Sequence, residues 1–146
     1  MKEILTRTEC TAMKGIAILG IMLHNYCHWL KGITRENEYT WSQWKNDQLN
    51  GHGKLSKKDG DVFEGSFING KIDGEVIIHY ANGSRFKGTY RNGKRNGKCI
   101  EETKDGKRFE GSYLDDVRDG RFVEKDANGQ VTSTGHYESG KRFNDQ

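Results

Sequence analysis

Residues 63–131 repeat themselves every 23 residues. The units are FEGSFINGKIDGEVIIHYANGSR (63–85), FKGTYRNGKRNGKCIEETKDGKR (86–108) and FEGSYLDDVRDGRFVEKDANGQV (109–131). When the units are aligned, glycines recur in the same columns. Two of these glycine columns extend upstream as Gly51 and Gly60, and the pattern resumes downstream one residue late at Gly135 and Gly140. A fixed period of this length indicates an architecture in which each unit packs mainly on its neighbours.

Each unit predicts two strands joined by turns. The first segment alternates as in Phe63-Glu64-Gly65-Ser66-Phe67, which places Phe63 and Phe67 on one face of a strand with a glycine between them. A second strand follows and ends at Asn82-Gly83 or its equivalent. The sequence therefore predicts a mainly β fold, an elongated single-layer antiparallel meander with two strands per repeat.

The first turn of each unit carries the strongest local signal. Asn69-Gly70 and Asn92-Gly93 occupy it, and Asn-Gly favours a tight hairpin because both residues tolerate positive φ. The third unit has Asp115-Asp116 in this place. We therefore expect a different turn conformation there.

The residues of this pattern resemble the MORN (membrane occupation and recognition nexus) repeat. Phe63-Glu64-Gly65, Asn69-Gly70-Lys71 and Asp73-Gly74 match its consensus, and the resemblance covers about residues 51–142. It implies an elongated, curved β-sheet that acts as an interaction or membrane-proximal module. It also implies no chemistry of its own, so we expect no catalytic residue, cofactor or metal in the repeats.

Composition agrees with a thin sheet. Only 32% of the residues are hydrophobic and 31% are charged, a ratio typical of disorder in an aperiodic chain but also of a sheet with little interior. The net charge of +3 argues against a specific nucleic-acid binder. Residues 86–108 nevertheless hold eight basic and three acidic residues. This segment could meet an acidic partner, or it could be a solvated face with cross-strand ion pairs.

The amino-terminal third differs in composition. Residues 15–30 carry no formal charge, and residues 16–23 are strongly apolar. We predict an amino-terminal segment (1–31) with a helix over about 10–31, a linker (32–46) and the repeat sheet (47–146). The helix is short for a bilayer but could span it if Lys14 snorkels, and a buried or interfacial helix is the alternative. The expectation is membrane association with the repeats on the cytoplasmic side, where the free thiols of Cys10, Cys27 and Cys99 would stay reduced.

Residues 8–25 also resemble the start of the integral-membrane acyltransferase-3 family. The resemblance implies that Lys14 opens a first transmembrane helix and that His24 serves acyl transfer. The further helices of such an enzyme are missing from this chain. The resemblance therefore implies a family amino terminus joined to a repeat array, with a fragment or split component of an acyltransferase as the alternative function.

Two other patterns point to chemistry only weakly. His24, Cys27 and His28 would share one face of a helix, but no fourth ligand lies nearby, so no metal site is predicted. Residues 88–94 fit GxxxxGK, but the Ser or Thr and the helix that a phosphate-binding loop requires do not follow. No cofactor is therefore predicted.

The candidate binding residues come from the aromatic columns and the basic middle repeat. Exposed rings could grip a partner, or the rings could be the only core that a one-layer sheet has, each covering a neighbour's glycine. We expect one concave face that serves both purposes, with basic side chains beside it for polar contacts. The candidates are Phe63, Phe67, Phe86, Lys87, Tyr90, Arg91, Lys94, Arg95, Lys98, Phe109, Tyr113 and Tyr137.

The expected partner is a protein or an anionic membrane lipid. Self-association through the sheet edges is a further expectation, because an unpaired edge strand can template pairing. Trp41 and Trp44 could anchor at a membrane interface or cap the open end of the sheet.

Overall fold

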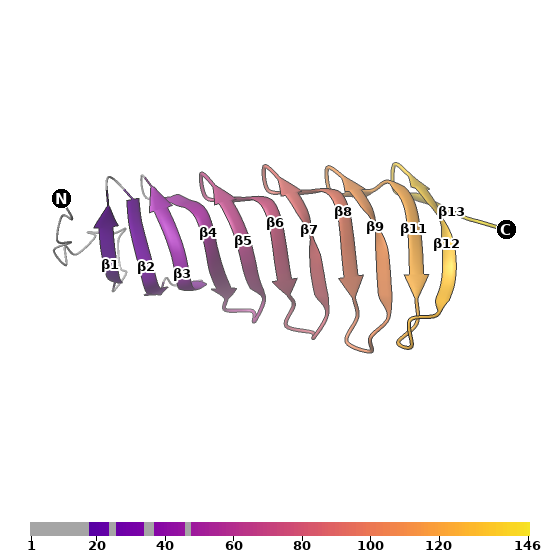
Figure 1. The fold of residues 1–146 in the computed structure, drawn as a ribbon, viewed down its shortest axis with the longest axis horizontal. Helices are drawn as coiled ribbons and strands as arrows, with labels where there is room; N and C mark the ends of the chain where they lie inside the picture. Colours follow the sequence, from indigo (N-terminus) through magenta and orange to yellow (C-terminus); the bar gives the residue numbers. More distant parts are fainter. Residues whose placement is uncertain (1–17, 24–25, 34–36, 46–47) are drawn as a thin grey trace, which may run out of the picture.

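The structure is a single antiparallel β-sheet that extends in the direction across its strands (Figure 1). It is a computed structural model that describes the backbone of residues 18–23, 26–33, 37–45 and 48–146, and the side chains of Lys45 and residues 48–146. Consecutive strands pair with one another, except that the two-residue β10 pairs only with β9 and β11 also pairs with β9. The predicted fold class, a single-layer antiparallel β-meander, is confirmed for this part of the chain.

The thirteen strands follow the order of the sequence. They are β1 (Ile18–Leu23), β2 (Tyr26–Ile33), β3 (Asn37–Lys45), β4 (Gln48–Lys57), β5 (Val62–Ile68), β6 (Lys71–His79), β7 (Arg85–Arg91), β8 (Lys94–Glu102), β9 (Arg108–Leu114), β10 (Val117–Arg118), β11 (Gly120–Lys125), β12 (Val131–Glu138) and β13 (Lys141–Asn144).

At the amino-terminal end, the described residues differ from the predicted helix over 10–31. β1 and β2 lie there as an antiparallel pair, and β2 pairs onward with β3. The other residues of the predicted helix, 10–17 and 24–25, lie outside the described residues. A short apolar run without a 3.6-residue period suits a strand as well as a helix, and the edge of β3 offers backbone groups to pair with. Within the described residues, no helix has the length and apolarity needed to cross a membrane.

The predicted linker over 32–46 is also corrected. β3 occupies residues 37–45 and pairs antiparallel with β4, with Lys45 opposite Gln48. Its sequence, NEYTWSQWK, is rich in aromatic and β-branched residues, which favour strands. The sheet therefore begins before residue 47.

The short turns have the left-handed geometry that Asn-Gly favours. Asn69 and Gly70 have φ of 49° and 77°, and Asn92 and Gly93 have 49° and 80°. The expectation of a different conformation at Asp115-Asp116 is wrong, because these residues have φ of 48° and 71°. Asp tolerates this region better than most residues. Asp116 Oδ1 also accepts hydrogen bonds from Arg95 N (2.9 Å) and Arg95 Nε (3.0 Å), which hold the turn in place.

Hydrogen bonds join each short turn to the preceding repeat. Gly70 N donates to Leu49 O, Gly93 N to Ile72 O, Asp116 N to Arg95 O and Gly140 N to Arg118 O, all at 2.9–3.0 Å. The four acceptors are spaced by 23 residues, like the repeat itself. The backbone thus fixes how successive repeats stack, and the array behaves as a continuous sheet.

The hydrophobic core lies on one face of the sheet. Its buried cluster is Phe63, Val76, Ile78, Phe86, Cys99, Phe109, Tyr113, Phe122 and Tyr137. A ring folds back over the glycine two residues later in its own strand: a Cβ on Gly88 would lie 2.8 Å from Phe86 Cζ, and one on Gly111 would lie 2.6 Å from Phe109 Cζ. The expected packing of ring on glycine is therefore present, but mostly within a strand rather than between neighbours.

Candidate functional site

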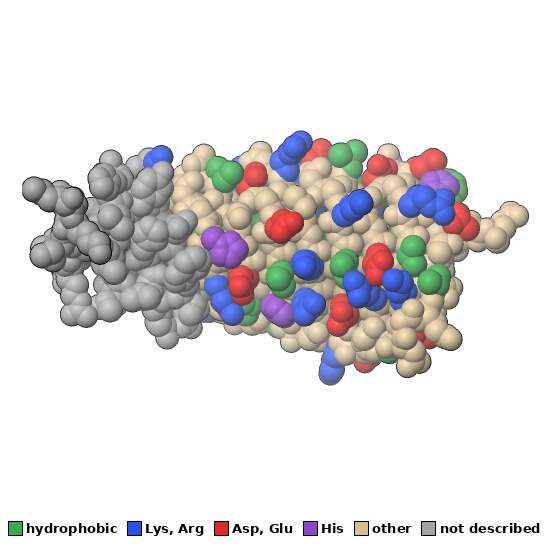
Figure 2. Space-filling model, viewed as in Figure 1, with side chains coloured by type: hydrophobic (Ala, Val, Ile, Leu, Met, Phe, Trp, Pro, Cys, Tyr) green, Lys and Arg blue, Asp and Glu red, His purple; other side chains and the backbone are tan. Residues whose placement is uncertain are grey.

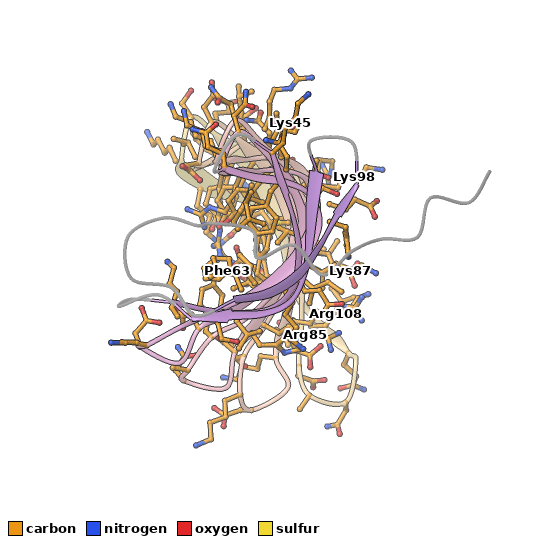
Figure 3. The ribbon with its side chains drawn as sticks, turned by 90° about the vertical axis from the view of Figure 1, so that its left-hand side faces the viewer. Lys45, Phe63, Arg85, Lys87, Lys98 and Arg108 are labelled. Atoms are coloured by element: carbon orange, nitrogen blue, oxygen red, sulfur yellow. The ribbon has the colours of Figure 1, made fainter. Side chains whose placement is uncertain are left out.

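The two faces of the sheet have different surroundings because the sheet curls along its strands. Seen along the long axis, Phe63 lies inside the curve, while Lys87 and Lys98 lie on the opposite side (Figure 3). We call the inner side the aromatic face and the other side the outer face. The predicted site residues are divided between them.

The aromatic face is closed by its own packing. Phe86 and Phe122 are each only 1% exposed, and Phe67 is 3% exposed. The rings contact one another: Phe86 and Tyr90 lie edge to face with centroids 5.7 Å apart, and Phe122 and Tyr137 are tilted with centroids 5.1 Å apart. These distances are those of well-packed aromatic pairs, so the rings act as a core.

Arginine side chains cover this core from the solvent side. The guanidinium carbon of Arg95 lies 4.2 Å from the Tyr113 ring centroid, that of Arg118 lies 4.0 Å from Phe109, and that of Arg142 lies 4.6 Å from Phe122. Cations in this position are attracted by the ring faces and also shield them from water. Of these three arginines, only Arg95 was predicted from the sequence as a site residue. Their spacing of 23 and then 24 residues was the available signal.

Arg118 is the most constrained of these arginines. Its Nη2 contacts Glu101 Oε2 at 2.6 Å, and its Nε and Nη1 donate to the hydroxyls of Tyr113 and Tyr137 at 3.2 Å each. Tyr113 in turn donates to Glu101 Oε1 at 2.5 Å. Burial opposes the charge of Arg118, but these hydrogen bonds outweigh it and raise its pKa. Its hydrogen-bonding groups are therefore used within the fold.

The outer face holds a hollow of about 800 Å³. Two rows of side chains that run across the strands line it, and the backbone of Gly65, Gly88 and Gly111 lies between them. We call it the outer-face groove. The first row is Glu64, Ile77, Lys87, Ile100 and Glu110, which are direct cross-strand neighbours. The second row is Glu75, Thr89, Lys98, Ser112 and Arg121. Figure 2 shows this face, where basic, acidic and hydrophobic side chains alternate.

Some charges in the outer-face groove are neutralised within the chain. Glu110 accepts from Lys125 Nζ at 2.8 Å, and this hydrogen bond lowers the pKa of its carboxyl group. Arg121 contacts Asp145 at 2.7 Å, and Glu64 faces Lys54 at 3.7 Å.

Other charges in the groove remain available. The side chains of Glu75, Lys87 and Lys98 have no hydrogen-bond or ion-pair partner within residues 48–146. These three side chains lie in the adjacent repeats 63–85 and 86–108, next to Ile77 and Ile100. The middle of the groove therefore combines aliphatic surface with charges that no other described group satisfies.

Two smaller hollows of about 590 and 450 Å³ share Arg118 in their lining. Several of their charged side chains are already paired. Arg118 contacts Glu101, and Arg95 Nε contacts Asp116 at 3.0 Å. Lys125, at the rim of the smaller hollow, contacts Glu110. In the larger of these hollows, Arg85, Glu102, Lys104 and Asp105 also have no side-chain partner within residues 48–146, so unpaired charge is not confined to the outer-face groove. The groove differs from both smaller hollows in its aliphatic side chains, Ile77 and Ile100.

The comparison with known families agrees with this geometry. The family model of the MORN repeat matches residues 42–62, 63–85 and 86–108. These matched residues are 67 of the 146 in the chain, and they are similar to a run of MORN repeats. MORN repeats generally mediate protein or lipid interactions. The first matched MORN unit begins at residue 42, nine residues before Gly51, where the sequence resemblance was expected to begin.

The predicted site residues fall into three groups on the repeat sheet. Phe63, Phe67, Phe86, Phe109, Tyr113 and Tyr137 are buried on the aromatic face, and Tyr90 is partly buried there. Arg95 covers the Tyr113 ring on the same face. Lys87 and Lys98 line the outer-face groove, while Arg91 and Lys94 flank the Asn92-Gly93 turn and are exposed. The expected single face of rings and basic side chains is thus divided.

Two ionisable groups of the core have raised pKa values. Burial raises the pKa of the Cys99 thiol to about 11 and that of the Tyr90 phenol to about 12, so both groups stay protonated at neutral pH. Lys14 and His24 of the acyltransferase-3 resemblance lie outside the described residues. The backbones of Cys27, His28, Trp41 and Trp44 lie in β2 and β3, but their side chains are not described.

Proposed function

We propose that the chain is a non-enzymatic interaction module that binds a protein partner along its outer-face groove. The groove crosses the MORN units 63–85 and 86–108 and continues over β9 and β11. The observation that carries the proposal is the unpaired charge of Glu75, Lys87 and Lys98 beside the aliphatic side chains of Ile77 and Ile100. Aliphatic surface supplies affinity, and unsatisfied charges supply selectivity.

The closed aromatic face supports the same assignment. A partner that used Phe86 or Phe122 would have to displace arginines and expose the core, which costs free energy of folding. A partner on the outer face meets side chains that already face water. Binding there leaves the fold unchanged.

Charge balance favours a protein over an anionic membrane as the occupant of the groove. Its lining has three basic side chains (Lys87, Lys98 and Arg121) and three acidic ones (Glu64, Glu75 and Glu110). Anionic headgroups are attracted by clusters of basic residues and repelled by carboxylates. Mixed charge suits a polypeptide that carries both signs.

Membrane attachment through residues 10–31, with the repeats on the cytoplasmic side, stays a separate prediction. The acyltransferase alternative also stays a prediction, because His24 lies outside the described residues.

The proposal is tested by placing a photo-crosslinking amino acid at Ile100 of the full chain in cells that produce it. A matched probe at Tyr80 reports on the aromatic face. We expect a discrete protein adduct from position 100 that disappears when Lys87 and Lys98 are both changed to Glu, and no such adduct from position 80.

Two outcomes would overturn the proposal. One is a charge-dependent protein adduct at position 80 without one at position 100. The other is strong binding of the purified chain to phosphatidylserine vesicles that the double reversal abolishes, since this would assign the groove to lipid.

A further inference from the structure

We propose that the occupant of the outer-face groove is an extended protein segment that runs across the strands and places an acidic side chain between Lys87 and Lys98. The proposal rests on the function proposed above and names the partner's conformation and charge. Three features of the groove carry it: its width, its period and the arrangement of its unpaired charges.

The width of the groove favours a thin chain. Its two rows of side chains stand two residues apart along each strand, a separation of about 7 Å. A helix with its side chains is about 10–12 Å across and would rest on top of the rows. An extended segment is narrow enough to follow the groove over Gly65, Gly88 and Gly111, with its side chains reaching between those of the two rows.

The period of the groove favours the same conformation. Equivalent side chains, such as Ile77 and Ile100, are two strands apart, which is about 9.6 Å. Three residues of polyproline II conformation rise about 9.3 Å, and residues three apart lie on the same side of that helix. Seven residues of an α-helix rise about 10.5 Å, so a helix loses register by nearly 1 Å per repeat. An extended segment can therefore present one residue in three to successive repeats.

The unpaired charges of the groove indicate which charged side chains the bound segment carries. Lys87 pairs with Ile100, which places Lys98 diagonally across from it, at a Cα separation of about 7–8 Å. One carboxylate between the two ammonium groups can contact both. Glu75 lies in the same row as Lys98 and two strands away, so it faces a position two or three residues from a carboxylate held between Lys87 and Lys98. A basic side chain is expected there.

The test is a selection of random twelve-residue peptides, displayed on phage, on the purified full chain. We expect enriched peptides with an acidic residue two or three positions from a basic one and with low helix propensity. Affinity should fall on the order of tenfold or more when Lys87 and Lys98 are both changed to Glu. Selection on that double variant should instead enrich a basic residue at the central position. Arg91→Glu, outside the groove lining, is the matched control and should leave the selected sequences unchanged.

The inference is overturned if no peptide enriches, if the enriched peptides are amphipathic helices, or if the double reversal leaves the selected charges as they were. Thermal unfolding of the double variant should match that of the parent chain, because both lysines face solvent and have no described partner. The result of the peptide selection can be distinguished from the result of the crosslinking experiment that tests the proposed function. A helical partner would still give the adduct at position 100, whereas an unused groove would give neither result.

Discussion

Replacing Gly65 with alanine is expected to destabilise the sheet by about 3 kcal/mol. A Cβ at this position would lie 2.4 Å from the carbonyl oxygen of Glu75 and 2.9 Å from the Cα of Val76. Both atoms belong to the backbone of β6, so neither can move aside as a flexible side chain would. Strands β5 and β6 would have to separate at the point where they pair. The free energy of unfolding in urea, followed by circular dichroism, measures the effect.

Gly97→Ala is the matched control for this prediction. Gly97 has a φ of +86°, so alanine there is strained, but its Cβ would meet only the Thr89 Cβ at 3.9 Å. We expect a smaller loss, about 1 kcal/mol, from the backbone conformation alone. Equal losses for the two variants would show that the close approach of β5 and β6 is not what requires glycine at position 65.

Replacing Phe86 with alanine is expected to cost about 3–5 kcal/mol, as is typical for a large aromatic side chain in a packed core. The side chain is 1% exposed and contacts Tyr90 and Tyr113, with centroids 5.7 and 6.4 Å away. A thin sheet has no second layer that could collapse into the cavity. Thermal and urea unfolding of the full chain report the loss.

Phe143→Ala provides the comparison on the outer face. Phe143 is only partly buried, and its ring stacks on His136 at a centroid distance of 5.1 Å, near the end of the sheet. Its removal should cost about 1 kcal/mol or less. If Phe86→Ala left stability unchanged but abolished partner binding, the aromatic face would be the binding surface and the assignment of the faces would be reversed.

The repeat period made most of the sheet predictable. Each glycine or Asn-Gly pair determines the conformation of its own turn. The sequence therefore predicts the short turns at Asn69-Gly70 and Asn92-Gly93 and the strands between them. Asp115-Asp116 was misjudged because its support comes from another repeat. The hydrogen bonds from Arg95 to Asp116 join residues 21 positions apart, and no local pattern reveals them.

The division of the candidate site between two faces was also available from the sequence. Phe86 and Lys87 are adjacent in one strand, so their side chains must point to opposite faces. The alternation of side chains along a strand does not show which charged groups are already paired within the fold. Glu110 is paired with Lys125, whereas Glu75 has no described partner, and this difference depends on neighbours from other repeats.

The amino-terminal strands were the least predictable element. The apolar residues of β1 carry no period that separates a strand from a helix, and composition alone favoured a helix. Pairing with β2 and β3 decides their conformation, and that pairing is a property of the whole sheet.

Covalent footprinting of the full chain, free and saturated with its partner or a selected peptide, tests most directly which face of the sheet is used. We expect that labelling of Ile77, Lys87 and Ile100 falls on binding, while labelling of the partly buried Tyr80 and Tyr90 stays the same. Protection of Tyr80 and Tyr90 with no change at Ile77 and Ile100 would contradict this expectation.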